Sequence, residues 1–509
     1  MKLRAHSLSR NIATNSASYV ITIAAAFIMY PVMIHRLGLA RYGLWMLISE
    51  LTGYYSYVGI GLRAGVQYYA ALYTAQDDRE ELNRTMSTSI WSLTGLGVAL
   101  AFAGFGLAAI FPMIFAPTGL DPRETSRSIV FMATALGLSL PVEAMNSALT
   151  AVKRLDVVNA MEMASRSIGS FAMLVCVING GGLVALSLIQ LVMRMLVGPC
   201  TWVAMRRTMP GVKLSLRYWS HDHLRRLARF GLPTVLIGLG WIVSSRTDLM
   251  IIGAVLGIPM VSFYAIPRSL MEYADAGIRA IAWSFTPHVT HLHAQGKNND
   301  VVSLYLRGAR LTGAAAFLLT ACIGVFGPPF LALWQGAEFV GGPWQNRAGV
   351  VLLILLAAFL PRLIHNMTTQ LFYGTNQLGF LMRISLLEGV VKVVLSLALV
   401  KPFGLAGIAV SNLIPMLLFE GLAIPLYLFR TYSVNAGVYF RDVFARSALA
   451  GGVACLTGAG LVFRFPPLHW PSLLLEAVVS ALAGLLCAAA IGVSGAERKA
   501  LWRQIARVS

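Results

Sequence analysis

The chain has 509 residues, of which 57% are hydrophobic and only 12% are charged. Soluble globular proteins usually have about a quarter of their residues charged, so the composition excludes an ordinary soluble enzyme, a disordered chain and a disulfide scaffold. It indicates an integral membrane protein. The net charge of +19 agrees with the excess of Lys and Arg on the cytoplasmic side of membrane proteins. We expect no nucleic-acid partner, because no basic run carries interleaved aromatic residues.

A membrane-spanning helix needs about 20 apolar residues, and the sequence contains stretches of about this length from end to end. The first follows Lys2, Arg4 and Arg10 and ends without a small-residue cleavage site, so we expect a retained helix and not a signal peptide. The predicted spans are 11–34, 42–65, 88–116, 128–152, 160–178, 183–205, 231–256, 260–287, 308–334, 348–373, 380–400, 404–429, 444–463 and 472–493.

The distribution of Lys and Arg predicts the orientation of these spans. With the N-terminus in the cytoplasm, 24 basic residues fall in cytoplasmic segments and 7 in outer loops. An even number of spans then places both termini in the cytoplasm. The 5 cysteines lie in or beside apolar stretches without close pairs, so we interpret them as packing residues and expect neither disulfides nor a zinc site.

Short motifs recur at nearly constant offset between the two halves of the chain. The ordered series favours an internal repeat over chance similarity among Gly- and Leu-rich helices. It predicts an all-α integral membrane protein of about 14 transmembrane helices, with two six-helix parallel repeats around a central cavity and two further C-terminal helices. The matched positions are Leu37 and Gly38 with Leu256 and Gly257, 61–64 with 277–280, 76–80 with 295–300, 93–95 with 311–313, and Pro141 with Pro361.

The repeat also predicts the domain organisation. We expect an N-terminal six-helix repeat at 1–205, a cytoplasmic basic connector at 206–230, and a C-terminal six-helix repeat at 231–430. Two additional helices and a cytoplasmic tail occupy 431–509. In this arrangement the substrate path lies between the two repeats.

Charged side chains inside the predicted spans are the main candidates for function, because each costs about 2.5–3.5 kcal/mol near the bilayer centre. Arg268, Glu272, Asp275 and Arg279 have spacings that place all four on one helix face. The pairs Arg268–Glu272 and Asp275–Arg279 can each neutralise locally. The stripe therefore borders a polar cavity or joins its helix to a neighbour through salt bridges.

Other polar residues are candidates for the same cavity. Arg246 and Asp248 are two residues apart and point to nearly opposite sides of one helix, so only one of them is expected to face the cavity. Arg63 is the repeat partner of Arg279, although its place near the cytoplasmic end of a span also suits snorkelling. Asn15 and Tyr19 belong to a polar stripe on the first helix, which suits cavity lining or helix packing equally.

Motifs of catalysis and of cofactor binding are lacking in the sequence. His288, His291 and His293 cluster after a span but lack the HExxH spacing of a metal site. The chain contains no Walker A motif and no G-x-S-x-G motif. We therefore expect no enzyme activity, no metal and no cofactor.

The motifs around the second span resemble those of a known transporter family. Residues 35–38 (HRLG), 42–45 (YGLW), Tyr54 and 59–62 (GIGL) are similar to the opening signature of polysaccharide-transport flippases, and 149–159 (LTAVKRLDVVN) is similar to their connection between helices four and five. This O-antigen and exopolysaccharide flippase family belongs to the superfamily that also contains the multidrug extruders and the peptidoglycan lipid flippase.

The resemblance implies a flippase that moves undecaprenyl-pyrophosphate-linked oligosaccharides across the bacterial inner membrane by alternating access, coupled to an ion. Arg246, Arg268, Arg279 and Arg63 would contact the anionic head group, with Asn15 and Tyr19 lining the cavity. Glu272, Asp275 and Asp248 would couple transport to protons or sodium. Partners would be the lipid-linked sugar, membrane lipids and a polysaccharide polymerase or glycosyltransferases. A peptidoglycan-precursor flippase, a multidrug or cation antiporter and, least favoured, a membrane glycosyltransferase or polymerase remain as alternatives.

Overall fold

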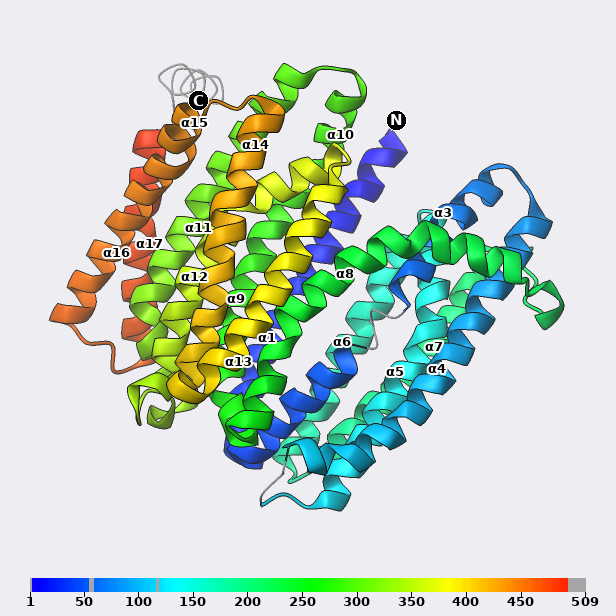
Figure 1. The fold of residues 1–509 in the computed structure, drawn as a ribbon, viewed down its shortest axis with the longest axis horizontal. Coiled ribbons are helices and arrows are strands. Elements are labelled where there is room, and N and C mark those ends of the chain that lie inside the picture. The colour runs from blue at the N-terminus through cyan, green and yellow to red at the C-terminus, as the bar shows by residue number, and fades with distance from the viewer. Residues whose placement is uncertain (1, 55–58, 116–118, 493–509) are drawn as a thin grey trace. The chain divides into compact units, whose positions relative to one another are not determined.

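The computed structural model describes residues 2–54, 59–115 and 119–492, with side chains described from residue 27 to residue 491 except at 55–58, 116–118, 233, 237 and 241. The regular secondary structure of this described part is entirely helical. The chain divides into two compact units, residues 1–262 and 263–509, and the division falls within one helix (Figure 1).

The first unit contains seven α-helices and one 3₁₀ turn within the described residues. They are α1 (Lys2–Gly53), α3 (Ile60–Ala75), α4 (Arg79–Phe115), α5 (Pro122–Ala151), α6 (Leu155–Ile178), α7 (Leu183–Thr208), η1 (Leu216–Tyr218) and α8 (His221–Val255). The sequence prediction places α8 in the second repeat, whereas in the structure it packs on α3, α4 and α1 of the first unit.

The second unit begins within α9 and contains the remaining described helices. These are α9 (Ile258–Trp283), α10 (Thr286–Ala294), α11 (Asn298–Gln335), η2 (Ala337–Phe339), η3 (Trp344–Asn346), α12 (Ala348–Gly374), α13 (Leu378–Pro415), η4 (Met416–Ala423), α14 (Ile424–Tyr432), α15 (Ala436–Tyr439), η5 (Phe440–Ala445), α16 (Arg446–Arg464) and α17 (Trp470–Gly492). Two of these segments, η4 and η5, are π-helical.

Among the described residues, ten helical stretches are long and apolar enough to cross a membrane, and one of them, Leu378–Tyr432, runs for 55 residues. At about 1.5 Å per residue this stretch is long enough for two crossings. A kink at Gly404 divides it, and a kink at Gly38 divides α1 in the same way. The ten stretches cover eleven of the fourteen predicted spans. The predicted spans 11–34 and 260–287 lie in the helices α1 and α9, and 42–65 includes residues 55–58, which lie outside the described residues. The expected all-α membrane architecture is therefore confirmed.

Positive φ angles mark the turns between helices, and several fall at matching places in the two halves of the chain. The repeated Leu-Gly pair has φ 80° at Gly38 and 95° at Gly257, a conformation that glycine adopts without a Cβ clash. The repeated polar stretch has φ 53° at Asp77 and 71° at Gly296. This recurrence supports the proposed repeat at the level of the backbone, independently of the short sequence matches.

Each unit has a hydrophobic core near one end of its helices. In the first unit the core includes Met86 of α4, Ala148 of α5 and Leu227 of α8, and in the second it includes Tyr305 of α11 and Phe372 of α12. Many large apolar side chains elsewhere on the helices are exposed, as expected for surfaces that contact lipid.

Candidate functional site

The charge stripe predicted on one helix face lies on α9. Arg268 Nε and Nη2 lie 2.9 and 2.8 Å from Glu272 Oε1, and Arg279 Nη1 lies 3.4 Å from Asp275 Oδ2. Both predicted i,i+4 ion pairs are therefore present. They differ in access, because the side chains of Arg268 and Asp275 are 8% and 9% exposed, whereas those of Glu272 and Arg279 are 49% and 45% exposed.

Asp275 also connects α9 to a second helix of the same unit. The Asn366 side chain of α12 donates a 3.0 Å hydrogen bond to Asp275 Oδ1. The carboxylate is thus shared between an amide donor on one oxygen and the Arg279 guanidinium on the other. Because the Arg279 contact is longer and more exposed, it is the one that a competing anion can replace most readily.

A second cluster of charges lies on α12, α13 and η4 of the same unit. Arg362 Nη2 lies 3.3 Å from Glu388 Oε1, and Arg362 Nε lies 3.3 Å from Glu420 Oε1. Lys392, one turn after Glu388 on α13, is only 2% exposed. The spacing of these residues in the sequence does not predict the cluster, since the three helical segments contribute one or two residues each.

The first unit contains a comparable pair between α1 and α8. Arg246 Nη1 lies 2.7 Å from Glu50 Oε2, with side chains 26% and 11% exposed. A side chain at Gly53 would meet the Arg246 guanidinium, so this glycine gives the arginine room. Asp248 is 2% exposed, so the more accessible member of the predicted opposing pair is Arg246.

Arg63 forms an ion pair between helices. Its Nη1 lies 3.0 Å from Glu143 Oε2 of α5, although snorkelling at a span end was an alternative for this residue. The pair joins α3 to α5 in the first unit, and the Asp275–Asn366 bond joins the corresponding helices α9 and α12 in the second. Each predicted repeat therefore has a polar link between its second and fourth predicted spans.

The remaining predicted residues contribute less to the site. Asn15 and Tyr19 lie in the first part of α1, where the helix is described but the side chains are not. His288, His291 and His293 lie on the short helix α10, with His291 and His293 in its last turn. Among the described residues no group of three or more His, Cys, Asp and Glu side chains is arranged to hold a metal ion.

Two curated relatives resemble the chain over most of its length. It is 21% identical to an uncharacterized membrane protein, EpsK of Bacillus subtilis, over 92% of each chain. It is 23% identical to a probable flippase, AglR of Haloferax volcanii, over 77% of each chain.

Solved structures with the same fold include two kinds of transporter. The lipid II flippase MurJ in an inward closed conformation aligns with TM-score 0.67 at 10% identity and covers 94% of this chain and 97% of that one. An inward-facing multidrug transporter of the MATE family aligns with TM-score 0.66 at 15% identity and covers 81% of this chain and 99% of that one. At these identities the likeness establishes the fold and does not separate the two activities.

The family comparison goes further than the fold. The family model described as polysaccharide biosynthesis protein matches residues 55–342, which is more than half of the chain and spans the first unit from α3 onward together with α9, α10 and α11. This multi-pass membrane protein, a transporter in its fold, therefore belongs to the polysaccharide biosynthesis protein family.

Proposed function

We propose that the protein is a flippase for an oligosaccharide linked to undecaprenyl pyrophosphate, which it moves from the cytoplasmic to the outer leaflet of a bacterial inner membrane by alternating access. The observation that carries this proposal is the state of Arg279. Its guanidinium lies on α9, in the predicted span 260–287, and is 45% exposed. Among the described residues, Arg279 forms a 3.4 Å ion pair with Asp275. Arginine binds phosphate groups through several charge-assisted hydrogen bonds, which suits a pyrophosphate head group.

The pairing on α9 suggests how binding couples to an ion. A pyrophosphate that takes Arg279 removes the cation in direct contact with Asp275, which is 9% exposed. Asp275 then keeps the Asn366 hydrogen bond and the longer-range attraction of Arg362. A buried carboxylate without its cation favours uptake of a proton or a sodium ion. We assign Asp275 the main coupling role, with Glu272 and Asp248 as further candidates, and Arg268, Arg246 and Arg63 as additional contacts for the head group.

Replacement of Arg279 tests the proposal. Arg279→Glu is expected to abolish complementation of a bacterial strain that lacks its O-antigen or exopolysaccharide flippase, because it repels the pyrophosphate. Arg383→Glu, an exposed arginine of α13 whose Nε donates to Gly379, is the matched control and should complement. Both variants are first compared for their amount in the membrane. Normal export by the Arg279→Glu protein at normal abundance would refute the assigned role.

A second arm of the experiment distinguishes the alternatives. The same two variants and the natural chain are expressed in a strain depleted of its peptidoglycan flippase and in a strain sensitive to cationic drugs. Rescue of the first strain alone would identify a peptidoglycan-precursor flippase, which the fold shared with MurJ favours as second candidate. Drug resistance alone would identify an antiporter. The acids of α9 are already neutralised by arginines, which gives the antiporter less support.

A further inference from the structure

The segment between α7 and α8 is fixed against the beginning of α4. Its main chain donates hydrogen bonds to three polar side chains on two neighbouring turns of α4. These bonds hold the main chain of the segment at three points, so the segment has a defined shape. The bonds are Lys213 N to Asn83 Oδ1 at 2.7 Å, Ser215 N to Ser87 Oγ at 3.2 Å, and Ser220 N to Thr88 Oγ1 at 3.1 Å.

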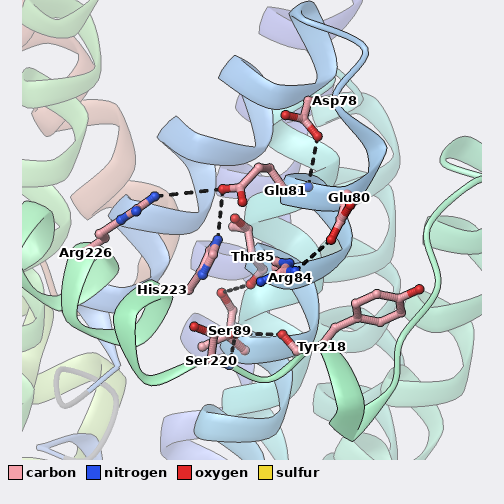
Figure 2. A network of polar contacts seen from close by, with 11 residues as sticks. Asp78, Glu80, Glu81, Arg84, Thr85, Ser89, Tyr218, Ser220, His223 and Arg226 are labelled. Carbon is pink, nitrogen blue, oxygen red and sulfur yellow. Dashed lines mark hydrogen bonds and ion pairs between the residues drawn. The ribbon is translucent and has the colours of Figure 1, made fainter.

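The first turns of α8 are fixed to the same helix by charge. His223 Nε2 lies 3.0 Å from Glu81 Oε2, and Arg226 Nη1 lies 3.9 Å from the same oxygen (Figure 2). Val212 and Leu227 belong to the hydrophobic core of the unit. Side chains on both flanks of the segment are thus buried, and its outward face is determined by the fold.

That outward face is basic and apolar at once. Between residues 206 and 230 the only acid is Asp222. Leu216 is 65% exposed and Trp219 is 42% exposed, with the Trp219 indole donating to Ser92 Oγ at 3.0 Å. In the described part of the chain, six exposed Lys and Arg side chains here form no ion pair, and one of them, Arg206, donates to the Val212 carbonyl instead. The other five lie on the outward face together with Leu216 and Trp219. We call these seven residues the connector surface: Arg207, Lys213, Leu216, Arg217, Trp219, Arg225 and Arg229.

The connector surface lies where the helices leave the apolar layer. The membrane-spanning part of α8 begins at Thr234, after the last basic residue of the surface. Thr88 and Ser92 of α4, which hold its other end, stand at the start of the predicted span 88–116. In Figure 1 the first part of α8 runs across the end of α4 before the helix turns along the unit, and the two helices are in contact.

We propose that the connector surface binds the head groups of anionic phospholipids. Basic side chains near a membrane surface are attracted to anionic lipids, and a neighbouring Trp and Leu enter the interface between head groups and acyl chains. The five cations are spread along residues 207–229, from the end of α7 through the connecting segment to the first turns of α8, which suits several separate phosphates better than one pyrophosphate ligand. The binding would anchor the rigid link between α7 and α8 to one leaflet.

Spin-labelled lipids test this binding on the full chain in vesicles. The fraction of motionally restricted phosphatidylglycerol, relative to phosphatidylcholine, gives the preference of the protein for the anionic lipid. The test variant is Arg217→Gln/Arg225→Gln/Arg229→Gln. The matched control, Arg123→Gln/Lys401→Gln/Arg464→Gln, removes the same charge from three exposed residues in predicted outer loops. We expect the natural chain and the control to prefer phosphatidylglycerol about equally, and the test variant to lose about half of that preference or more.

Each outcome decides the proposal. Loss of the preference in the test variant alone, together with a decline of the natural chain's preference at high salt, supports it. Equal preference in all three proteins, or none in the natural chain, overturns it. So does a result in which the test variant keeps its preference for phosphatidylglycerol but binds a short-chain isoprenyl pyrophosphate more weakly, because the surface then recognises a transport substrate. Failure of the flippase proposal leaves this lipid measurement unaffected.

Discussion

Arg362 shares its guanidinium between carboxylates from two other helical segments. Glu388 is contributed by α13 and Glu420 by η4, where the π-helical geometry adds a residue to the turn. Such bulges commonly occur at functional positions. The two acids are 3% and 11% exposed at the side chain, so water solvates them little, and the Arg362 guanidinium contributes to stabilising both.

Replacement of Arg362 by methionine should destabilise the protein strongly. Removing one partner of a buried ion pair costs about 3–5 kcal/mol. Here Glu388 and Glu420 would stay buried without the guanidinium that both of them contact. We expect a clearly lower melting temperature for the purified protein in detergent. Arg383→Met, at an exposed position of α13, is the control and should melt close to the natural chain.

A triple variant separates two causes of the Arg362→Met effect, the loss of a charge partner and the loss of packing. Adding Glu388→Gln and Glu420→Gln removes the two buried charges that have lost Arg362, so the triple variant should recover part of the lost melting temperature. A single variant that melts with the Arg383→Met control would contradict this account of the cluster.

At the scale of elements, α4 and α5 pack extensively in the first unit, and their closest approach lies at two glycines. A Cβ at Gly97 would collide with the main-chain carbonyl of Gly137, and a Cβ at Gly137 would collide with that of Gly97. Small residues at helix crossings let backbones approach closely in membranes, where association depends on such packing.

Gly97→Ala should therefore force α4 and α5 apart and destabilise the first unit by about 1–3 kcal/mol, the usual effect of overpacking. Gly95→Ala is a close control, since this glycine lies on the same helix with nothing within 4 Å of the added Cβ. Alanine also favours helix, so the control should be neutral or slightly stabilising. The comparison is made by thermal melting in detergent, and equal melting of the two variants would refute the role of the crossing.

The positions of the spans could be predicted from sequence because the length of an apolar stretch is a local property. The α9 stripe could be predicted for the same reason, since its four residues share one helix and their spacing fixes their face. The Arg362 cluster could not, because its residues are 26 and 58 positions apart and meet only through tertiary packing. The attachment of the basic connector to Asn83, Ser87 and Thr88 depends on tertiary structure in the same way.

At the scale of the whole molecule, the prediction from the basic residues concerns which side of the membrane each loop faces. A charge bias decides orientation over short loops, and the predicted cytoplasmic loops carry most of the Lys and Arg. The connector surface and the turn at Lys297 belong to the predicted cytoplasmic side. Arg123 and Lys401 belong to the predicted outer side. Arg123, Arg217, Lys297 and Lys401 are exposed on the protein surface. Whether a reagent reaches these positions therefore depends on the side of the membrane they face and not on burial within the protein.

Single cysteines introduced into a chain whose 5 natural cysteines are replaced by alanine measure this orientation directly. Cysteine at position 217 or 297 should react with a membrane-impermeant maleimide only after the cells are opened, because both positions lie on the predicted cytoplasmic side. Cysteine at 123 or 401 should react in intact cells. Reaction of all four in intact cells, or the reverse pattern, would contradict the predicted topology. The proposed flipping starts from the cytoplasmic leaflet. The reverse pattern would therefore also mean that substrate enters at the ends of the helices now predicted to face outward.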